Sequence, residues 1–195
     1  MTASALASER LFDRFAERAG LGEDAGLREL VEAVRQIPYA RPKVRTPDGV
    51  VSEWRGTCSS KHALLAALAG HRFPDSEVRL RHRVYHLTPE SARRLFGEDV
   101  ARQVPQDGLT DVHTYATAVA GGGRITRGRR VQLDITFPGD PWDGRSDMTL
   151  CCGEGIDDID AGPDAVASKQ ELVERHCEPG LRDSFIAALM RRTAR

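Results

Sequence analysis

Residues 54–68 read WRGTCSSKHALLAAL, in which a cysteine stands between a Gly-Thr pair and an apolar run. The apolar residues after Cys58 predict a helix from Cys58 to about residue 69 that is buried over most of its surface. A first helical turn presents free N–H groups and a positive dipole end, which lower the pKa of a cysteine there from about 8.5 to about 3.5–7.5. A lone cysteine before an apolar helix is more often a core residue, so other segments must decide whether Cys58 is a nucleophile.

The remaining elements predict an α+β fold. The expected helices are 8–20, 27–37, 89–103 and 168–192, the last broken at Pro179-Gly180, and the expected strands are 76–87, 111–120 and 129–138. Two loops are expected, at 38–54 and at 139–165, because these segments are rich in turn residues. Helices followed by antiparallel strands predict a central Cys58 helix packed on an antiparallel sheet, with extra N- and C-terminal helices.

Composition indicates one domain with no basic or membrane-spanning character. The 195 residues fit a helical extension at 1–50, a core at 51–140 and a loop with C-terminal helices at 141–195. A net charge of -1 favours neither nucleic acid nor an anionic membrane as partner. No apolar run approaches the roughly 20 residues that span a bilayer, and we expect no signal peptide. Four cysteines without a disulfide pattern predict a cytoplasmic protein.

A nucleophilic cysteine needs a general base, and six histidines are available. His62 lies one turn after Cys58 on the same helix face and points away from the open helix end, so we expect a packing role for it. His113 and Asp134 alternate with apolar residues in neighbouring strands. A two-residue turn at Gly123-Arg124 would place them directly opposite each other, with Cβ atoms about 4.5–5.5 Å apart, whereas a longer loop changes this register.

Four segments in this order resemble the core of the transglutaminase-like superfamily, which is related to papain-like cysteine peptidases. They are GTCSSKHALLAAL, RHRVYHL, DVHTYATAV and VQLDITFP, and the resemblance covers residues 54–138. It implies that Cys58 is the nucleophile, His113 the base and Asp134 the residue that orients the histidine.

The resemblance also implies supporting residues around this triad: Trp54 as the counterpart of a side chain that helps to stabilise the oxyanion, and Tyr115 as the aromatic residue two positions after the histidine. From their positions at the start of the cysteine helix, Thr57 and His62 are expected to support the oxyanion or the triad as well. The family's Asp-x-Thr motif is intact at 134–136, whereas the predicted helix at 89–103 is an insertion relative to the family.

The predicted function is that of a cysteine-dependent hydrolase or acyl transferase that forms a thioester with a peptide, protein or small amide or ester substrate. Two alternatives stay open: a non-catalytic transglutaminase-like binding domain, and an acyltransferase of the arylamine N-acetyltransferase type. The sequence leaves hydrolysis, transamidation and the oligomeric state open.

No cofactor or metal is expected. The possible zinc ligands Cys151, Cys152, His176 and Cys177 lack the Cys-x2-Cys spacing of structural zinc sites. The acidic run at 154–160 lacks the ligand spacing of an EF-hand and is expected to be a solvated loop.

Overall fold

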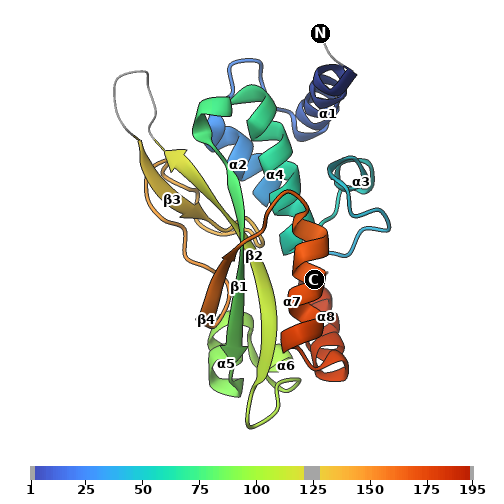
Figure 1. The fold of residues 1–195 in the computed structure, drawn as a ribbon, viewed down its shortest axis with the longest axis vertical. Helices are drawn as coiled ribbons and strands as arrows, with labels where there is room; N and C mark the ends of the chain where they lie inside the picture. The colour runs from blue at the N-terminus through green and yellow to red at the C-terminus, as the bar shows by residue number, and fades with distance from the viewer. Residues whose placement is uncertain (1–2, 121–127, 194–195) are drawn as a thin grey trace. The chain divides into compact units, whose positions relative to one another are not determined.

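The computed structural model describes residues 3–120 and 128–193 and has an α+β fold (Figure 1). Within these residues the chain forms eight α-helices, a short 3-10 helix and a four-stranded antiparallel sheet in the order β3-β2-β1-β4. The helices are α1 (Ala3–Ala19), α2 (Leu27–Arg35), α3 (Pro47–Glu53), α4 (Cys58–Arg72), η1 (Pro74–Ser76), α5 (Pro89–Phe96), α6 (Glu98–Ala101), α7 (Ala165–His176) and α8 (Pro179–Thr193). The strands are β1 (Arg79–Leu87), β2 (Leu109–Ala120), β3 (Arg129–Leu133) and β4 (Glu154–Asp160). The predicted α+β class is confirmed.

The chain divides into two compact units. Unit 1 comprises Met1–Leu80 and Tyr115–Leu150, and unit 2 comprises Arg81–Thr114 and Cys151–Arg195. The boundaries fall inside β1 and β2, so each of these strands contributes one part to each unit. The single-domain organisation inferred from chain length stays a prediction. None of the helices in the described residues is long and apolar enough to cross a membrane.

Helix α4 is the centre of unit 1. It contacts α1, α2 and α3 (Figure 1). Leu64, Leu65 and Leu68 of this helix are fully buried and belong to the same hydrophobic core as Val131 and Leu133 of β3. Burying a leucine side chain contributes about 1.5–3 kcal/mol, so this apolar face holds α4 against the sheet.

The register of β2 and β3 differs from the predicted one. The two strands pair antiparallel with Ala116 opposite Leu133. This register lies two residues from the one that a turn at Gly123-Arg124 predicts, so the predicted opposition of His113 and Asp134 is wrong. The predicted turn itself lies outside the described residues. A shift of two residues leaves each side chain on the same face of the sheet. The alternation of apolar and polar residues is therefore compatible with both registers, and the length of the connecting loop selects between them.

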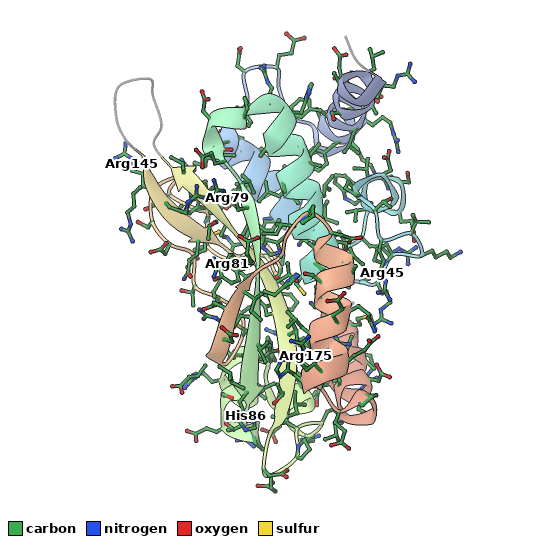
Figure 2. All side chains as sticks on the ribbon, viewed as in Figure 1. Arg45, Arg79, Arg81, His86, Arg145 and Arg175 are labelled. Carbon is green, nitrogen blue, oxygen red and sulfur yellow. The ribbon has the colours of Figure 1, made fainter. Side chains whose placement is uncertain are left out.

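The acidic run 154–160 forms strand β4 and not the expected solvated loop. It pairs antiparallel with β1, and Figure 2 labels Arg81 and His86 in the paired part of β1. Arg83 stands opposite Asp158 and donates to both carboxylate oxygens, at 2.9 and 2.6 Å. Opposite charges at directly paired positions stabilise antiparallel strands. The residues of this run show no strand alternation of their own, so their sequence does not indicate a strand, and their pairing depends on the basic strand beside them.

Local signals account for most helix ends. As predicted, a helix begins at Pro89 after the cap Thr88, but it divides at Gly97, whose φ of 85° ends α5 before α6 begins. Helix α3 lies within a segment that was expected to be loop. The Thr46 side chain caps this helix, because it accepts the N–H of Gly49 at 3.2 Å. The strand expected at 129–138 is shorter in the structure. It is β3, which ends at Leu133, five residues earlier than expected.

Candidate functional site

Cys58 is the first residue of α4, and its main-chain surroundings are well ordered by hydrogen bonds. The preceding residue, Thr57, is the extended N-cap, with φ -92° and ψ 177°. Its N–H donates to the Ser60 hydroxyl at 2.9 Å, a short version of the capping box. The Cys58 side chain is 8% exposed. The thiol therefore lies at the positive end of a buried helix, where an anion is stabilised.

Gly56 holds the chain in position just before the cysteine. Its N–H donates to Pro38 O at 3.1 Å, and its carbonyl accepts the N–H of Ala40 at 3.2 Å, which forms a short parallel bridge. A Cβ atom at this position would lie 2.7 Å from Cγ of Lys61. Glycine is required here because the lysine stem passes too close for any side chain.

Lys61 is a buried cation that the sequence analysis missed. It is 0% exposed. Its ammonium group donates to Arg35 O at 2.8 Å, Ile37 O at 2.9 Å and Thr136 O at 3.0 Å, so all three N–H groups have acceptors. Lysine is almost never fully buried without such partners. This residue connects the start of α4 with the end of α2 and with the segment after β3.

His62 is fully buried one turn after Cys58. Its Nδ1 lies 2.7 Å from Cys58 O, an atom that can only accept, so Nδ1 carries the proton. Nε2 then accepts the N–H of Ile135 at 3.1 Å, with Leu133 O at 3.2 Å beside it. Both ring nitrogens are used by main-chain groups, so His62 joins α4 to the end of β3 as a neutral ring.

Asp134 directly follows β3 in unit 1 and is also buried, at 4% exposure. Its Oδ1 accepts the N–H of Thr136 at 3.1 Å and lies 4.0 Å from Nε2 of His62. Since His62 carries its proton on Nδ1, this approach is not a hydrogen bond. The Thr136 hydroxyl is buried, and it has no hydrogen-bond partner among the residues that the structure describes.

His113, on β2 in unit 2, has a thiol neighbour that the sequence analysis did not pair with it. The imidazole is 5% exposed. Its Nε2 lies 4.0 Å from Sγ of Cys151, which is partly buried. Histidine nitrogen and thiolate sulfur are ligands that zinc prefers, but a tetrahedral zinc site needs four ligands. No sequence signal indicated this pair because its members are 38 positions apart.

Trp54 and Tyr115, the aromatic residues that the resemblance indicates, are both in unit 1. Trp54 has a left-handed backbone, with φ 53°, as the C-cap of α3. Its ring lies 5.8 Å from the Phe15 ring, and the Arg18 guanidinium lies 5.0 Å from its centroid. Tyr115 is 5% exposed on β2. The Trp54 ring thus packs on α1, while its backbone leads into the segment before Cys58.

A second buried histidine of unit 2, His82, has a strongly lowered pKa. The Ser168 hydroxyl donates to Ala161 O at 2.9 Å and so accepts from His82 Nε2, also at 2.9 Å. Nδ1 of His82 lies 3.1 Å from the Thr114 hydroxyl, which can donate to it, so the ring is neutral. Burial lowers the pKa of His82 from 6.5 to about 4, with a further contribution from the positive charge of Lys169.

We expect acid to destabilise the fold through His82. Between pH 6.5 and about 4 the unfolded chain binds a proton at this residue and the folded chain does not. The stabilising contribution is therefore complete above pH 6.5 and is lost as the pH falls toward 4, by up to about 3 kcal/mol. Urea unfolding followed by circular dichroism at pH 7, 6 and 5 measures it.

The His82→Gln variant is the control because glutamine does not titrate. As the pH is lowered, the free energy of unfolding of this variant should fall less steeply than that of the parent protein. The difference between the two slopes should be at most about 1.4 kcal/mol per pH unit. Equal pH slopes for the variant and the parent protein would contradict the prediction.

Comparison of the chain with protein family models, with curated proteins and with solved structures finds no match.

Proposed function

We propose that this protein is a cysteine-dependent hydrolase or acyl transferase with a transglutaminase-like core, in which Cys58 is the nucleophile. The observation that carries the proposal is the position of Cys58 as the first residue of the buried helix α4. The first turn of a helix carries main-chain N–H groups that have no acceptor within the helix, and such groups can stabilise a thiolate or an oxyanion. Gly56 and Lys61 hold this helix end in a fixed place, and a fixed nucleophile is what acyl transfer requires.

The proposed reaction uses His113 as base and Asp134 as the residue that orients it. His113 accepts the thiol proton, and the Cys58 sulfur forms a bond to the acyl carbon of an amide or ester. The N–H groups at the start of α4 donate to the oxyanion. The imidazolium then gives its proton to the leaving amine or alcohol, and water or a second amine releases the acyl group from the thioester.

Three features of the described residues support this choice of base. His62 is the histidine nearest to Cys58 in sequence, but both of its ring nitrogens are used by main-chain groups. Its Nδ1 proton is donated to Cys58 O, so the ring holds the helix and does not take a thiol proton. Asp134 is held by the Thr136 N–H, as expected of a carboxylate that must keep one orientation. His113 is buried and belongs to β2, a rigid support for a base.

The contact between His113 and Cys151 favours a second candidate. In this alternative Cys151 is the reactive thiol, because its sulfur lies 4.0 Å from the imidazole. Cys151 follows a loop and precedes β4, so it lacks the helix N-terminus that recommends Cys58. The four cysteines form no disulfide within the described residues, and we propose that the protein acts in a reducing compartment, the cytoplasm.

Alkylation of the individual cysteines tests the proposal without a known substrate. Iodoacetamide is applied at pH 7, and the rate at each cysteine is read from its peptide by mass spectrometry. We expect Cys58 to react at least tenfold faster in the folded protein than in urea, because the helix end and the base favour the thiolate. His113→Asn should lower that rate about 100-fold, the scale of general base assistance.

The matched control is His86→Asn, because His86 is an exposed histidine on β1. It should leave the Cys58 rate unchanged. A Cys58 rate equal to that in urea, or independent of His113, would overturn the proposal. A fast, His113-dependent rate at Cys151 would move the nucleophile to Cys151.

A further inference from the structure

Unit 1 has a pocket of about 380 Å³ that takes no part in the proposed reaction. It is formed where the start of α2, the end of α4 and η1 meet Val119 of β2 and the loop at 142–144. Pockets that hold small molecules in proteins have volumes of about 300–1,000 Å³, so this pocket is large enough for a compact ligand. Its position depends only on elements of unit 1.

Two arginines of the lining lack carboxylate partners. Arg28 has no hydrogen-bond or ion-pair partner among residues 3–120 and 128–193. Arg72 donates through Nη2 to a main-chain carbonyl, Glu23 O, at 2.9 Å and makes no ion pair within the same residues. Asp75 is the one acidic residue in the lining, and neither arginine is paired with it. The lining therefore carries an excess positive charge with donors to spare.

Two carboxylates near Arg28 in the sequence accept main-chain N–H groups and form no ion pair with these arginines. Glu29, the neighbour of Arg28 in sequence, accepts the N–H of Gly26 at 3.1 Å as part of the α2 cap. Glu32 accepts the N–H of Trp142 at 2.8 Å. By contrast Arg14, another exposed arginine of unit 1, is paired with a carboxylate at 2.8 Å. The pocket thus keeps guanidinium groups for which the described part of the chain supplies no counter-ion.

Apart from Ser76, the rest of the lining has no polar side chain except the indole N–H of Trp142, and it includes a rigid aromatic wall. Phe73 and Val119 are partly buried, and Trp142 is 4% exposed. The Trp142 ring is locked because its Nε1 donates to Ser146 O at 2.7 Å while its main-chain N–H is bound to Glu32. An aromatic wall that is already fixed binds a flat ligand without losing side-chain entropy.

We propose that this pocket binds a small organic anion, with a carboxylate, sulfonate or phosphate group held by Arg28 and Arg72 and a flat apolar body against Trp142. Guanidinium groups bind such oxyanions through paired, charge-assisted hydrogen bonds. Asp75 at the rim disfavours ligands with a second negative group. The site is independent of Cys58, so its test does not depend on the proposed reaction.

The probe is 8-anilinonaphthalene-1-sulfonate, which combines a sulfonate with flat aromatic rings. The protein carries the substitution Trp54→Phe, so that Trp142 is its sole tryptophan and reports binding by energy transfer to the probe. We expect saturable quenching of Trp142 emission. The double variant Arg28→Gln/Arg72→Gln should raise the dissociation constant at least tenfold, while Arg14→Gln, outside the pocket, should not change it.

A neutral probe separates charge recognition from apolar adsorption. N-phenyl-1-naphthylamine has the same rings without the sulfonate, and we expect it to bind at least tenfold more weakly. Thermal unfolding of each variant shows that its fold is intact. The proposal is overturned if the sulfonate binds equally well to the double arginine variant, if the neutral probe binds as tightly, or if binding leaves Trp142 emission unchanged.

Discussion

Replacing Lys61 with methionine is expected to lower the free energy of unfolding by about 3–5 kcal/mol. Methionine fills a similar volume, so the loss comes from polar groups and not from a cavity. Three carbonyls lose their donor: Ile37 O and Thr136 O in buried hydrogen bonds, and Arg35 O in a partly buried one. Each unsatisfied buried carbonyl costs about 1–3 kcal/mol. Two of them lie at the C-terminal end of α2, where the helix dipole favours a cation.

Urea unfolding of the parent protein and of Lys61→Met measures this difference. Lys43→Met is the matched control, because Lys43 is exposed and a surface substitution changes stability by no more than about 0.5 kcal/mol. We also expect Lys61→Met to reduce the alkylation rate at Cys58, since the start of α4 loses an anchor three residues after the cysteine. A stability loss below about 1 kcal/mol would show that the three hydrogen bonds do not hold unit 1 together.

Replacing Asp111 with alanine is expected to destabilise unit 2 by about 3–5 kcal/mol. Asp111 is 4% exposed and accepts from Arg182 Nε at 2.7 Å and from the Tyr85 hydroxyl at 3.2 Å. Without the carboxylate, the largely buried Arg182 guanidinium loses its ion pair with Asp111, and the Tyr85 hydroxyl loses the acceptor that Asp111 supplies. A charge left in the interior without compensation costs far more than an exposed pair contributes.

A double-mutant cycle tests the cause of that loss. Asp111→Ala combined with Arg182→Met should cost less than Asp111→Ala alone, because the uncompensated charge is removed with its partner. Tyr85→Phe should cost only about 1 kcal/mol. Additive losses in the double variant would contradict the explanation by a buried charge.

Cys177 supplies a second readout of the same cluster. Its pKa is raised to about 11, first by burial and then by the negative charge of Asp111. Removing that charge should lower the Cys177 pKa, so that alkylation of Cys177 in the folded Asp111→Ala protein begins at a lower pH. An unchanged pH profile would show that burial alone sets the reactivity of this thiol.

The parts of the fold that were predictable from sequence depend on signals between close neighbours in the chain. The Gly-Thr pair before an apolar run places the start of α4 at Cys58, and Thr88-Pro89 places the start of α5. Alternating residues indicated β2 and β3, although β3 ends at Leu133, earlier than its pattern suggested. These signals hold because capping and side-chain alternation depend on residues a few positions apart.

By itself, then, the sequence determined the α+β class and the start of the cysteine helix, because both follow from local hydrogen bonding and from the burial of apolar faces. Only the tertiary structure decided the β2–β3 register, the strand β4 and the burial of Lys61. The register depends on loop length, β4 depends on the arginines of β1, and Lys61 needs carbonyls up to 75 positions away in the chain. Polar groups withdrawn from water must find partners wherever the fold supplies them, and a linear pattern does not record where that is.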